Sequence, residues 1–468
     1  MSNKGCPYSE GEIQWLQQMG MHLEKRPALD RPQPSVLIVA AKWWATSARL
    51  ASGLHRHGCH VRAVCPTGHP LTHVSGIRHV YRYGGLFSLS SLRRILHDCR
   101  PNFVIPCDDG VAAQLHALYA LDPTLRDLIE RSLGSPESYP VVDSRLRFLS
   151  MANELGIRVP RTQLVAKAED LLTWHENTAS AAAVLKIDGE SGGNGVRISR
   201  SLDESLAAWR ELQVPCSVST AWKRLVIDRD PLALWRRGRH REREVTVQEF
   251  IPGRPANSML VCWRGALLAI VSVVVVAAEG PTGAATVVRV IRNERMKRAA
   301  ELVVSRLKLS GFYGLDFILE SGTGVPYLIE MNPRCTQLGH IELAGAGSLA
   351  GVLSAVLHGD PRPPPHNPLR GDTIALFPQA LAAGKVCLPY IRASYHDLPA
   401  DEPQLLRELM LKPWPQRQWA ARLYHAIRPI RWVEPLIFDD REVGEERDAV
   451  AVAADESSST SRVQRAGR

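Results

Sequence analysis

The sequence predicts an α/β and α+β protein with more than one domain, and three observations carry this prediction. From Ser35 onward, apolar strand-like runs such as SVLIVAA, HVRAVCP and FVIPCDD alternate with helix-like segments, which is typical of a parallel sheet. Strand-rich segments separated by glycine-containing loops follow between residues 141 and 360. The chain has 468 residues, which is long enough for about three domains with a sizeable core.

The first part of the chain predicts a polar leader and then a parallel sheet. Residues 1–34 are polar and end in the proline-rich linker RPALDRPQP. Two tryptophans follow the first strand of the 35–140 region, where a dinucleotide-binding turn has glycines, so no dinucleotide is assigned to it. Asp108 and Asp109 follow a later strand, at the edge where such sheets bind ligands. They are candidates for contact with an acceptor substrate, with a helix cap or surface turn as the alternative.

Oxygen-bearing side chains gather in the segment from Gly314 to Arg334. GLDFILE and VPYLIEMN are expected to form two strands joined by the turn SGTG. Glu330 and Asn332 lie two residues apart and therefore share a face. Asp316 joins them only if the loop holds an odd number of residues or a bulge shifts the register. Two carboxylates and an amide oxygen suit Mg²⁺, and the alternative is an ordinary hairpin with a polar surface.

Two further motifs precede this hairpin. The run KIDGESGGNGV, from Lys186 to Val196, lies between apolar runs, and its glycines let backbone N–H groups face an anion. It is neither a Walker loop nor a dinucleotide fingerprint, and a glycine-rich hairpin turn is the alternative. The run VTVQEFIPGRPANS, from Val245 to Ser258, is expected to be a strand that breaks at Pro252-Gly253. Such a strand end can hydrogen-bond a purine.

Taken in order, these three motifs resemble the ATP-grasp superfamily of ATP-dependent ligases. The resemblance extends over residues 141–360. It implies an N-terminal Rossmann-like pre-grasp domain at 35–140, followed by a two-lobed ATP-grasp fold at 141–360. Beyond the proline-rich run PRPPPHNP we expect a small C-terminal module at 370–438 and a disordered tail at 439–468.

The resemblance implies roles for individual residues. Lys186 would contact the adenine or the α-phosphate, and the glycine loop would close over the β- and γ-phosphates. Asp316, Glu330 and Asn332 would hold two Mg²⁺ ions, with Mn²⁺ as an alternative metal, and Arg334 would stabilise the transferring phosphoryl group. The residues expected to bind the nucleotide are Lys186, Gly192, Gly193, Gly195, Gln248, Glu249, Phe250 and Ile251.

Three further residues are candidates for contacts at the site or depart from the family pattern. Arg145 occupies a place where the family often has a lysine, which keeps the charge but changes the geometry of a phosphate contact. Asn257 is the nearest polar candidate for a ribose contact after the strand break. Arg289, in the strand-like run VVRVIRNER, is a second catalytic candidate through phosphate or carboxylate contact, with an exposed strand arginine as the alternative.

The resemblance implies an ADP-forming ligase that activates a small carboxylate as an acyl phosphate for attack by an amine, a thiol or another nucleophile. Phosphoryl transfer depends mainly on positioning and charge neutralisation, which this inventory of residues can supply. The alternative is a non-catalytic nucleotide-binding or regulatory protein with the same fold. A homodimer is compatible with the sequence.

Composition limits the remaining classes. The net charge is +9, and its densest source is the segment from Trp222 to Glu244, for which a solvated insertion, an acidic substrate or nucleic acid are alternatives. No nucleic-acid motif accompanies the charge, so no nucleic-acid partner is expected. The apolar run Ala266 to Ala278 is too short to cross a bilayer and predicts a buried strand.

Two absences in the sequence bear on the location of the protein and on the bonding of its cysteines. The chain starts without a secretory signal pattern, so a cytoplasmic location is expected. Nine cysteines without a CxxC pair indicate neither a disulfide framework nor a zinc site. Membrane contact is not expected, although the basic and aromatic run KPWPQRQWAARLYHAIRPIRW could suit a membrane surface.

Overall fold

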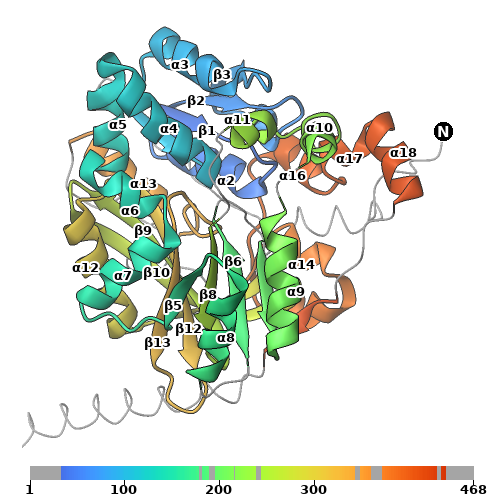
Figure 1. The fold of residues 1–468 in the computed structure, drawn as a ribbon. Helices are drawn as coiled ribbons and strands as arrows, with labels where there is room; N and C mark the ends of the chain where they lie inside the picture. Colours follow the sequence, from blue (N-terminus) through green and yellow to red (C-terminus); the bar gives the residue numbers. More distant parts are fainter. Residues whose placement is uncertain are drawn as a thin grey trace, which may run out of the picture.

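The computed structural model describes residues 33–178, 182–188, 195–214, 217–238, 244–342, 348–359, 372–428 and 434–438. Three sheets organise these residues, and Figure 1 shows how the helices surround them. The mixture of one parallel and two largely antiparallel sheets confirms the predicted α/β and α+β class. The leader up to residue 32 and the tail from residue 439 lie outside the described residues.

The N-terminal sheet is parallel and has the strand order β3-β2-β1-β4. Helix α2 packs on one face and helices α3, α4 and α5 on the other, so β1 is apolar and buried from Val36 to Val39. The elements are β1 (Ser35–Val39), α2 (Ala45–Arg56), β2 (His60–Cys65), β3 (Ile77–Arg82), α3 (Ser88–Cys99), β4 (Phe103–Pro106), α4 (Asp109–Leu121), α5 (Arg126–Leu133) and α6 (Tyr139–Val142).

A small antiparallel sheet follows, with the order β5-β8-β6-β7. Helices α8 and α9 cover one of its faces through a cluster that includes the buried Trp174. The glycine run connects β6 and β7, so the two predicted strands that flank it are confirmed, while residues 189–194 lie outside the described residues. The elements are α7 (Arg145–Glu154), β5 (Thr162–Val165), α8 (Ala168–Glu176), β6 (Ala183–Ile187), β7 (Val196–Ser199), α9 (Leu202–Gln213) and β8 (Val245–Glu249).

The largest sheet has the order β13-β12-β9-β10-β11-β14-β15, with β16 paired to β10. One face packs on α7 and α12, and the other packs on α2, α13 and the N-terminal sheet. The predicted buried strand is β10, with the expected ends. The elements are β9 (Gly253–Trp263), β10 (Ala266–Ala278), β11 (Ala285–Ile291), α12 (Glu294–Leu307), β12 (Gly311–Glu320), β13 (Pro326–Asn332) and α13 (Leu349–Leu357).

The residues after 372, expected as a small C-terminal module, are built into this large sheet. β14 pairs with β11, and Leu405, Leu406 and Leu409 join the core that contains β1 and β2. The elements are β14 (Thr373–Ala375), α14 (Gln379–Ala382), α15 (Leu388–Ala393), β15 (Tyr395–His396), α16 (Pro403–Leu409), α17 (Trp414–Arg417), α18 (Trp419–Ile427) and β16 (Leu436–Ile437).

The basic segment between α9 and β8 forms two short helices, α10 (Val218–Val226) and α11 (Ala233–Gly238). Leu232 anchors it in the core of the N-terminal sheet. Within the described ranges, no helix is both long and apolar enough to cross a membrane. The seven cysteines in those ranges are all free.

Candidate active site

A cavity of about 690 Å³ lies between the small sheet and the large sheet. Four segments that are distant in the sequence line it: the β6–β7 connection, the end of β8, the β9–β10 pair and the β12–β13 hairpin. The lining includes ten of the residues predicted from the sequence, namely Lys186, Gly195, Gln248, Glu249, Phe250, Ile251, Asp316, Glu330, Asn332 and Arg334. Gly192 and Gly193 lie outside the described residues.

The β12–β13 hairpin places its polar side chains on the cavity side by means of a bulge. Asp316 pairs directly with Glu330, and Gly314 pairs with Asn332. Between Asp316 and Phe317 the register shifts by one residue, so that Ile329 is the extra residue in β13. The shift that the sequence required for a shared face is therefore present.

Asp316 is a buried carboxylate with amide partners. It accepts a hydrogen bond from Asn257 Nδ2 at one oxygen and from Asn332 Nδ2 at the other, the latter at 2.8 Å. Burial raises the pKa of Asp316, and the nearby Glu330 carboxylate raises it further. Asn257, expected as a ribose candidate, contacts this carboxylate instead.

The donor set at this hairpin fits a hard divalent cation. Two carboxylates that repel each other in a buried place are stabilised by a positive charge between them, and the Asn332 amide offers a further oxygen. In the described part of the chain, no group of three or more His, Cys, Asp and Glu residues is arranged to hold a metal ion. The fit to magnesium therefore rests on two carboxylates and one amide.

Arg145, at the start of α7, spans the two sheets. Its Nη2 lies 2.6 Å from Glu330 Oε1 and its Nη1 lies 2.9 Å from Asp188 Oδ1. The side chain is 6% exposed, so both ion pairs are shielded from water. Asp188 was not predicted as a site residue, although its position two residues after Lys186 was a signal that both could face the same cavity.

Lys186 lies deep in the cavity on β6. Its Nζ donates a hydrogen bond of 2.7 Å to Gln248 Oε1, and Gln248 in turn donates to Thr162. Burial lowers the pKa of Lys186 to about 8, and the neighbouring Arg145 contributes to the shift. In this arrangement the hydrogen-bond partner of the Lys186 ammonium group is a neutral amide, so the ammonium group can also bind an anion.

The strand end after β8 forms another part of the cavity wall. The backbone N–H of Glu249 donates to Arg161 O at 2.9 Å, which ends the β5–β8 pairing. Phe250 and Ile251 lie between β8 and β9 and belong to the pairing of neither strand. Both residues line the cavity together with Glu249.

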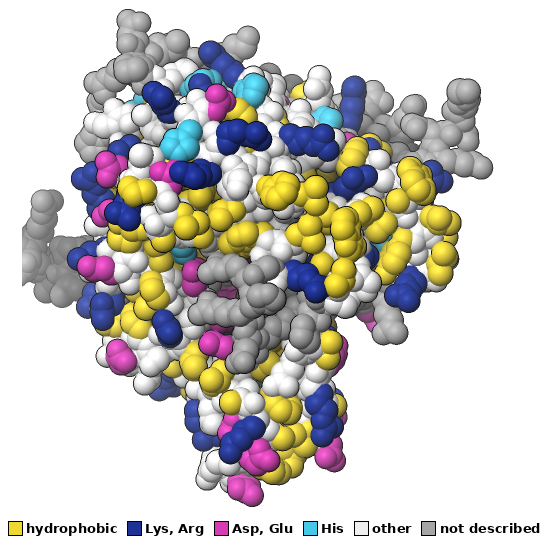
Figure 2. Space-filling view, turned by 45° about the horizontal axis from the view of Figure 1, so that its top comes forward, with side chains coloured by type: hydrophobic (Ala, Val, Ile, Leu, Met, Phe, Trp, Pro, Cys, Tyr) yellow, Lys and Arg dark blue, Asp and Glu magenta, His cyan; other side chains and the backbone are white. Residues whose placement is uncertain are grey.

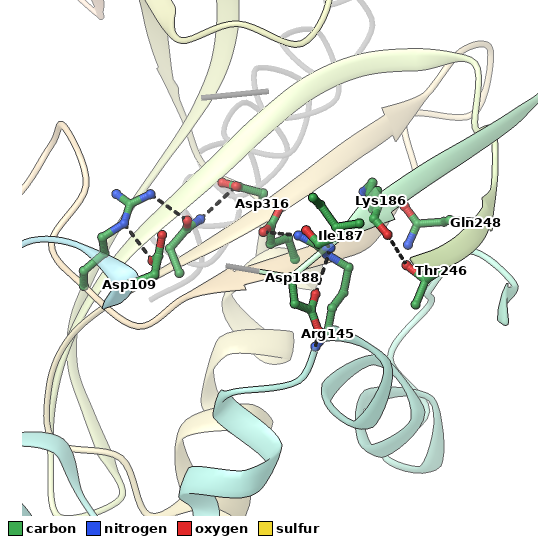
Figure 3. A network of polar contacts seen from close by, with 11 residues as sticks. Asp109, Arg145, Lys186, Ile187, Asp188, Thr246, Gln248 and Asp316 are labelled. Atoms are coloured by element: carbon green, nitrogen blue, oxygen red, sulfur yellow. Dashed lines mark hydrogen bonds and ion pairs between the residues drawn. The ribbon is translucent and has the colours of Figure 1, made fainter. Parts of the chain in front are cut away.

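Arg334 connects the hairpin to the N-terminal sheet. Its Nε lies 2.9 Å from Asp109 Oδ1, and its Nη2 donates to Asn332 Oδ1 at 3.0 Å. Its guanidinium carbon lies 5.9 Å from the ring centre of Trp44, which also lines the cavity. Figure 3 shows the polar side chains extending from Asp109 through Asp316 and Arg145 to Lys186 and Gln248.

The two candidate aspartates after β4 have different roles. Asp108 caps α4 by accepting from Val111 N, and it also accepts from Ala41 N at 2.7 Å. This residue therefore follows the helix-cap alternative. Asp109 instead reaches Arg334 and so lies next to the cavity.

Arg289, predicted as a second catalytic residue, is not among the residues that line the cavity with the other predicted residues. It lies on β11 between Val288, which lines the cavity, and Val290, and neighbouring strand residues point to opposite faces. Its Nε donates to Thr373 Oγ1 on β14 at 3.3 Å. Arg289 therefore contacts the neighbouring strand of the sheet, and the arginines that line the cavity are Arg145, Arg200 and Arg334.

Comparison with known families assigns the domain. Residues 232–337 match the family model of the ATP-grasp domain, which includes β8, the strand break and the β12–β13 hairpin. The chain carries an ATP-grasp domain. Lys186 and the glycine run precede the matched segment, and Lys186 and Gly195 line the same cavity. Comparison with curated protein sequences gives no significant match.

Solved structures share this ATP-grasp fold over most of the chain. N5-carboxyaminoimidazole synthetase from Staphylococcus aureus with ADP is 13% identical, has a TM-score of 0.51, and aligns over 73% of this chain and 82% of its own. Carboxyaminoimidazole ribonucleotide synthase from Aspergillus clavatus with ATP is 14% identical, has a TM-score of 0.52, and aligns over 70% and 78%. The biotin carboxylase domain of 2-oxoglutarate carboxylase from Hydrogenobacter thermophilus, with MgADP and bicarbonate, is 12% identical, has a TM-score of 0.51, and aligns over 73% and 72%.

Proposed function

We propose that this ATP-grasp protein is an ADP-forming ligase that activates a carboxylate as an acyl phosphate for attack by an amine or another nucleophile. The observation that carries the proposal is the cavity, in which a buried lysine, two carboxylates with an amide, and two arginines face one another. Structurally similar proteins bind ATP, ADP or MgADP according to their names, which supports ATP as the nucleotide here.

In this proposal the nucleotide spans the cavity from the strand break to the hairpin. The Glu249 side chain and the backbone of Phe250 and Ile251 bind the adenine edge. Lys186, held by Gln248, contacts a phosphate, which would offset the burial and the Arg145 charge that lower the pKa of Lys186 in the free protein. The glycine run with Gly192, Gly193 and Gly195 covers the remaining phosphates with backbone N–H groups.

Asp316, Glu330 and Asn332 would hold Mg²⁺, with Mn²⁺ as an alternative, and the metal would neutralise phosphate charge when bound. Arg334 faces the phosphoryl group in transfer, and its contacts with Asp109 and Asn332 fix its orientation. An oxygen of the substrate carboxylate bonds to the γ-phosphorus, and the bond to ADP breaks. The nucleophile then bonds to the acyl carbon, loses a proton, and releases phosphate.

The acceptor side of the cavity is formed partly by the N-terminal sheet. Trp44 and Thr46, at the start of α2, line the cavity beside Arg334. A small carboxylate placed there would lie near both the arginine and the phosphate-binding side chains. In this proposal the carboxylate and the nucleophile bind at the junction of the two sheets. One similar protein binds 5-aminoimidazole ribonucleotide together with ADP according to its name, which supports a second substrate beside the nucleotide.

One observation favours a second candidate, a protein that binds a nucleotide without turnover. Glu330 is ion-paired with Arg145, and the Asn332 oxygen accepts a hydrogen bond from Arg334. Two of the three proposed metal ligands thus have cationic partners within the chain. An arginine that stays on Glu330 would oppose metal binding by its positive charge.

The deciding experiment measures ADP and phosphate release from Mg-ATP with a panel of small carboxylates and amines. We expect one carboxylate to stimulate release, and Glu330→Gln to reduce the stimulated rate at least about 100-fold, because a metal ligand is lost while the hydrogen bond to Arg145 is kept. Glu320→Gln is the matched control, since Glu320 ends β12 at the hairpin turn and contacts Thr323. ATP binding without stimulated release by any acid would favour the second candidate.

A further inference from the structure

Helix α10 exposes apolar side chains at helical spacing. Val218, Trp222 and Val226 recur every four residues and are 53%, 49% and 43% exposed. The residue that this helix buries is the small Ala221. A surface helix normally turns its large apolar side chains to the core, so the arrangement on α10 is the reverse of the usual one.

Helix α18 has the same arrangement. Trp419, Leu423 and Ile427 also recur every four residues, and they are 78%, 58% and 75% exposed. Its buried residue is again a small one, Ala421. Two helices that are about 200 residues apart in the sequence therefore present their apolar sides outward.

The two helices are neighbours. Lys223 Nζ of α10 lies 5.6 Å from the ring centre of Tyr424 on α18. Figure 1 places α10, α17 and α18 at one end of the molecule, and Figure 2 shows hydrophobic side chains gathered there with Lys and Arg among them. We call the six exposed side chains the apolar surface: Val218, Trp222, Val226, Trp419, Leu423 and Ile427.

On the α18 side of the apolar surface the charge has one sign, while on the α10 side Lys223 is ion-paired with Asp228. The sequence from Lys412 to Val433 contains five basic residues and no acidic residue. Arg422 and Arg428 are exposed on α18 and at its end, and within the described ranges neither forms an ion pair. A second copy of the chain docked by two-fold symmetry would bring these like charges together, which disfavours a homodimer through this surface.

We propose that the apolar surface binds an anionic lipid bilayer. Tryptophan and aliphatic side chains on a helix enter the boundary between headgroups and acyl chains, while arginine and lysine contact lipid phosphates. From the sequence alone we expected no membrane contact, and this proposal departs from that expectation. The sequence shows a basic and aromatic run at α18, but the outward direction of its apolar residues and their pairing with α10 are properties of the fold.

The test is flotation of the full-length protein with lipid vesicles. We expect binding to vesicles of phosphatidylcholine with phosphatidylglycerol, weaker binding to pure phosphatidylcholine, and a loss of binding as salt rises. The double variant Trp419→Ser with Leu423→Ser should reduce the bound fraction about tenfold, because two membrane-facing side chains become polar. The charge-reversal variant Arg422→Glu with Arg428→Glu should reduce binding to the anionic vesicles.

The control is Leu121→Ser at the end of α4, since Leu121 is 63% exposed but lies outside the apolar surface. This variant should bind vesicles as the unchanged protein does, and circular dichroism should show that every variant is folded. Absence of binding to anionic vesicles, or full binding by the Trp419 and Leu423 variant, overturns the proposal. A dimer in solution that this variant converts to a monomer also overturns it, because the surface is then an interface between copies.

Discussion

Arg145 shows what a single side chain can do between two sheets. Its planar guanidinium reaches Asp188 and Glu330 with different nitrogens, which the single ammonium group of a lysine does less well. The two carboxylates come from the small and the large sheet, so the arginine holds the walls of the cavity together. The family resemblance pointed to this position from the sequence, but neither partner of the arginine could be identified from it.

The first prediction concerns the two ion pairs of Arg145. Arg145→Met leaves two partly buried carboxylates without their cation, and we expect a loss of about 3 kcal/mol in the free energy of unfolding. The measurement is the thermal unfolding midpoint. Arg147→Met, an exposed position on the same helix, is the control and should change stability by less than about 0.5 kcal/mol. Equal midpoints for the two variants would contradict the prediction.

The second prediction follows from the pKa of Lys186. Burial lowers this pKa to about 8, and a bound phosphate would raise it again. At pH 8 the free protein is therefore partly deprotonated at Lys186, and nucleotide binding should take up about half a proton. At pH 6.5 the ammonium is already protonated, so the uptake from this group should vanish. Calorimetry in buffers of different ionisation enthalpy measures the uptake.

The control for this experiment is Lys186→Arg, which stays charged across the pH range and should remove the uptake at pH 8. An uptake that persists in this variant would show that another group titrates on binding. An uptake that is equal at pH 6.5 and pH 8 in the unchanged protein would contradict the lowered pKa.

At the scale of elements, the C-terminal residues are locked to the N-terminal sheet by a buried polar group. Asp397, which follows β15, lies 2.6 Å from Arg49 on α2 and 2.8 Å from His340. Burial by itself would raise the pKa of Asp397, but Arg49 and His340 outweigh it and hold the pKa below its usual range. The stability that this carboxylate contributes is present at neutral pH and is lost as the pH falls below the pKa of an unfolded aspartate, about 4.

The third prediction compares the buried ion pair Arg49–Asp397 with the more exposed ion pair Arg56–Asp401. Both arginines lie on α2. Asp397→Ala leaves Arg49, which is 5% exposed, without its carboxylate partner and should lower the free energy of unfolding by about 3 to 5 kcal/mol. Asp401→Ala removes the partner of Arg56, which is 26% exposed, and should cost less than about 1 kcal/mol. Thermal unfolding of both variants at neutral pH provides the comparison. Similar losses in the two variants would show that burial does not govern these pairs.

At the scale of the whole molecule, the N-terminal sheet and the ATP-grasp domain share one site. Trp44 and Asp109 come from the first sheet, and Arg334 comes from the hairpin of the largest one. The core beneath this junction contains side chains from both sheets and from the C-terminal residues. Separate domains along the chain thus meet as one packed body around the cavity.

The fourth prediction tests this junction. Asp109→Asn removes the charge that orients Arg334, and under the proposed ligase activity kcat should fall about tenfold because the arginine acts on the transferring phosphoryl group. The dissociation constant for ATP should change little, since Asp109 lies away from the proposed adenine and lysine contacts. Asp127→Asn, exposed on α5, is the control. A weakened ATP affinity with an unchanged kcat would assign Asp109 to nucleotide binding instead.

The sequence by itself determined the class of the fold, the β10 strand, the order of the three motifs and ten of the residues that line the cavity, because strand periodicity and glycine loops are local properties of the chain. Only the tertiary structure decided the rest. Five features depend on strands and helices that are distant in the sequence. They are the Ile329 bulge, the partners of Arg145, the position of Arg289 away from the cavity, the capping role of Asp108, and the outward apolar faces of α10 and α18. Their registers and contacts are set by packing of the whole chain, which no local pattern records.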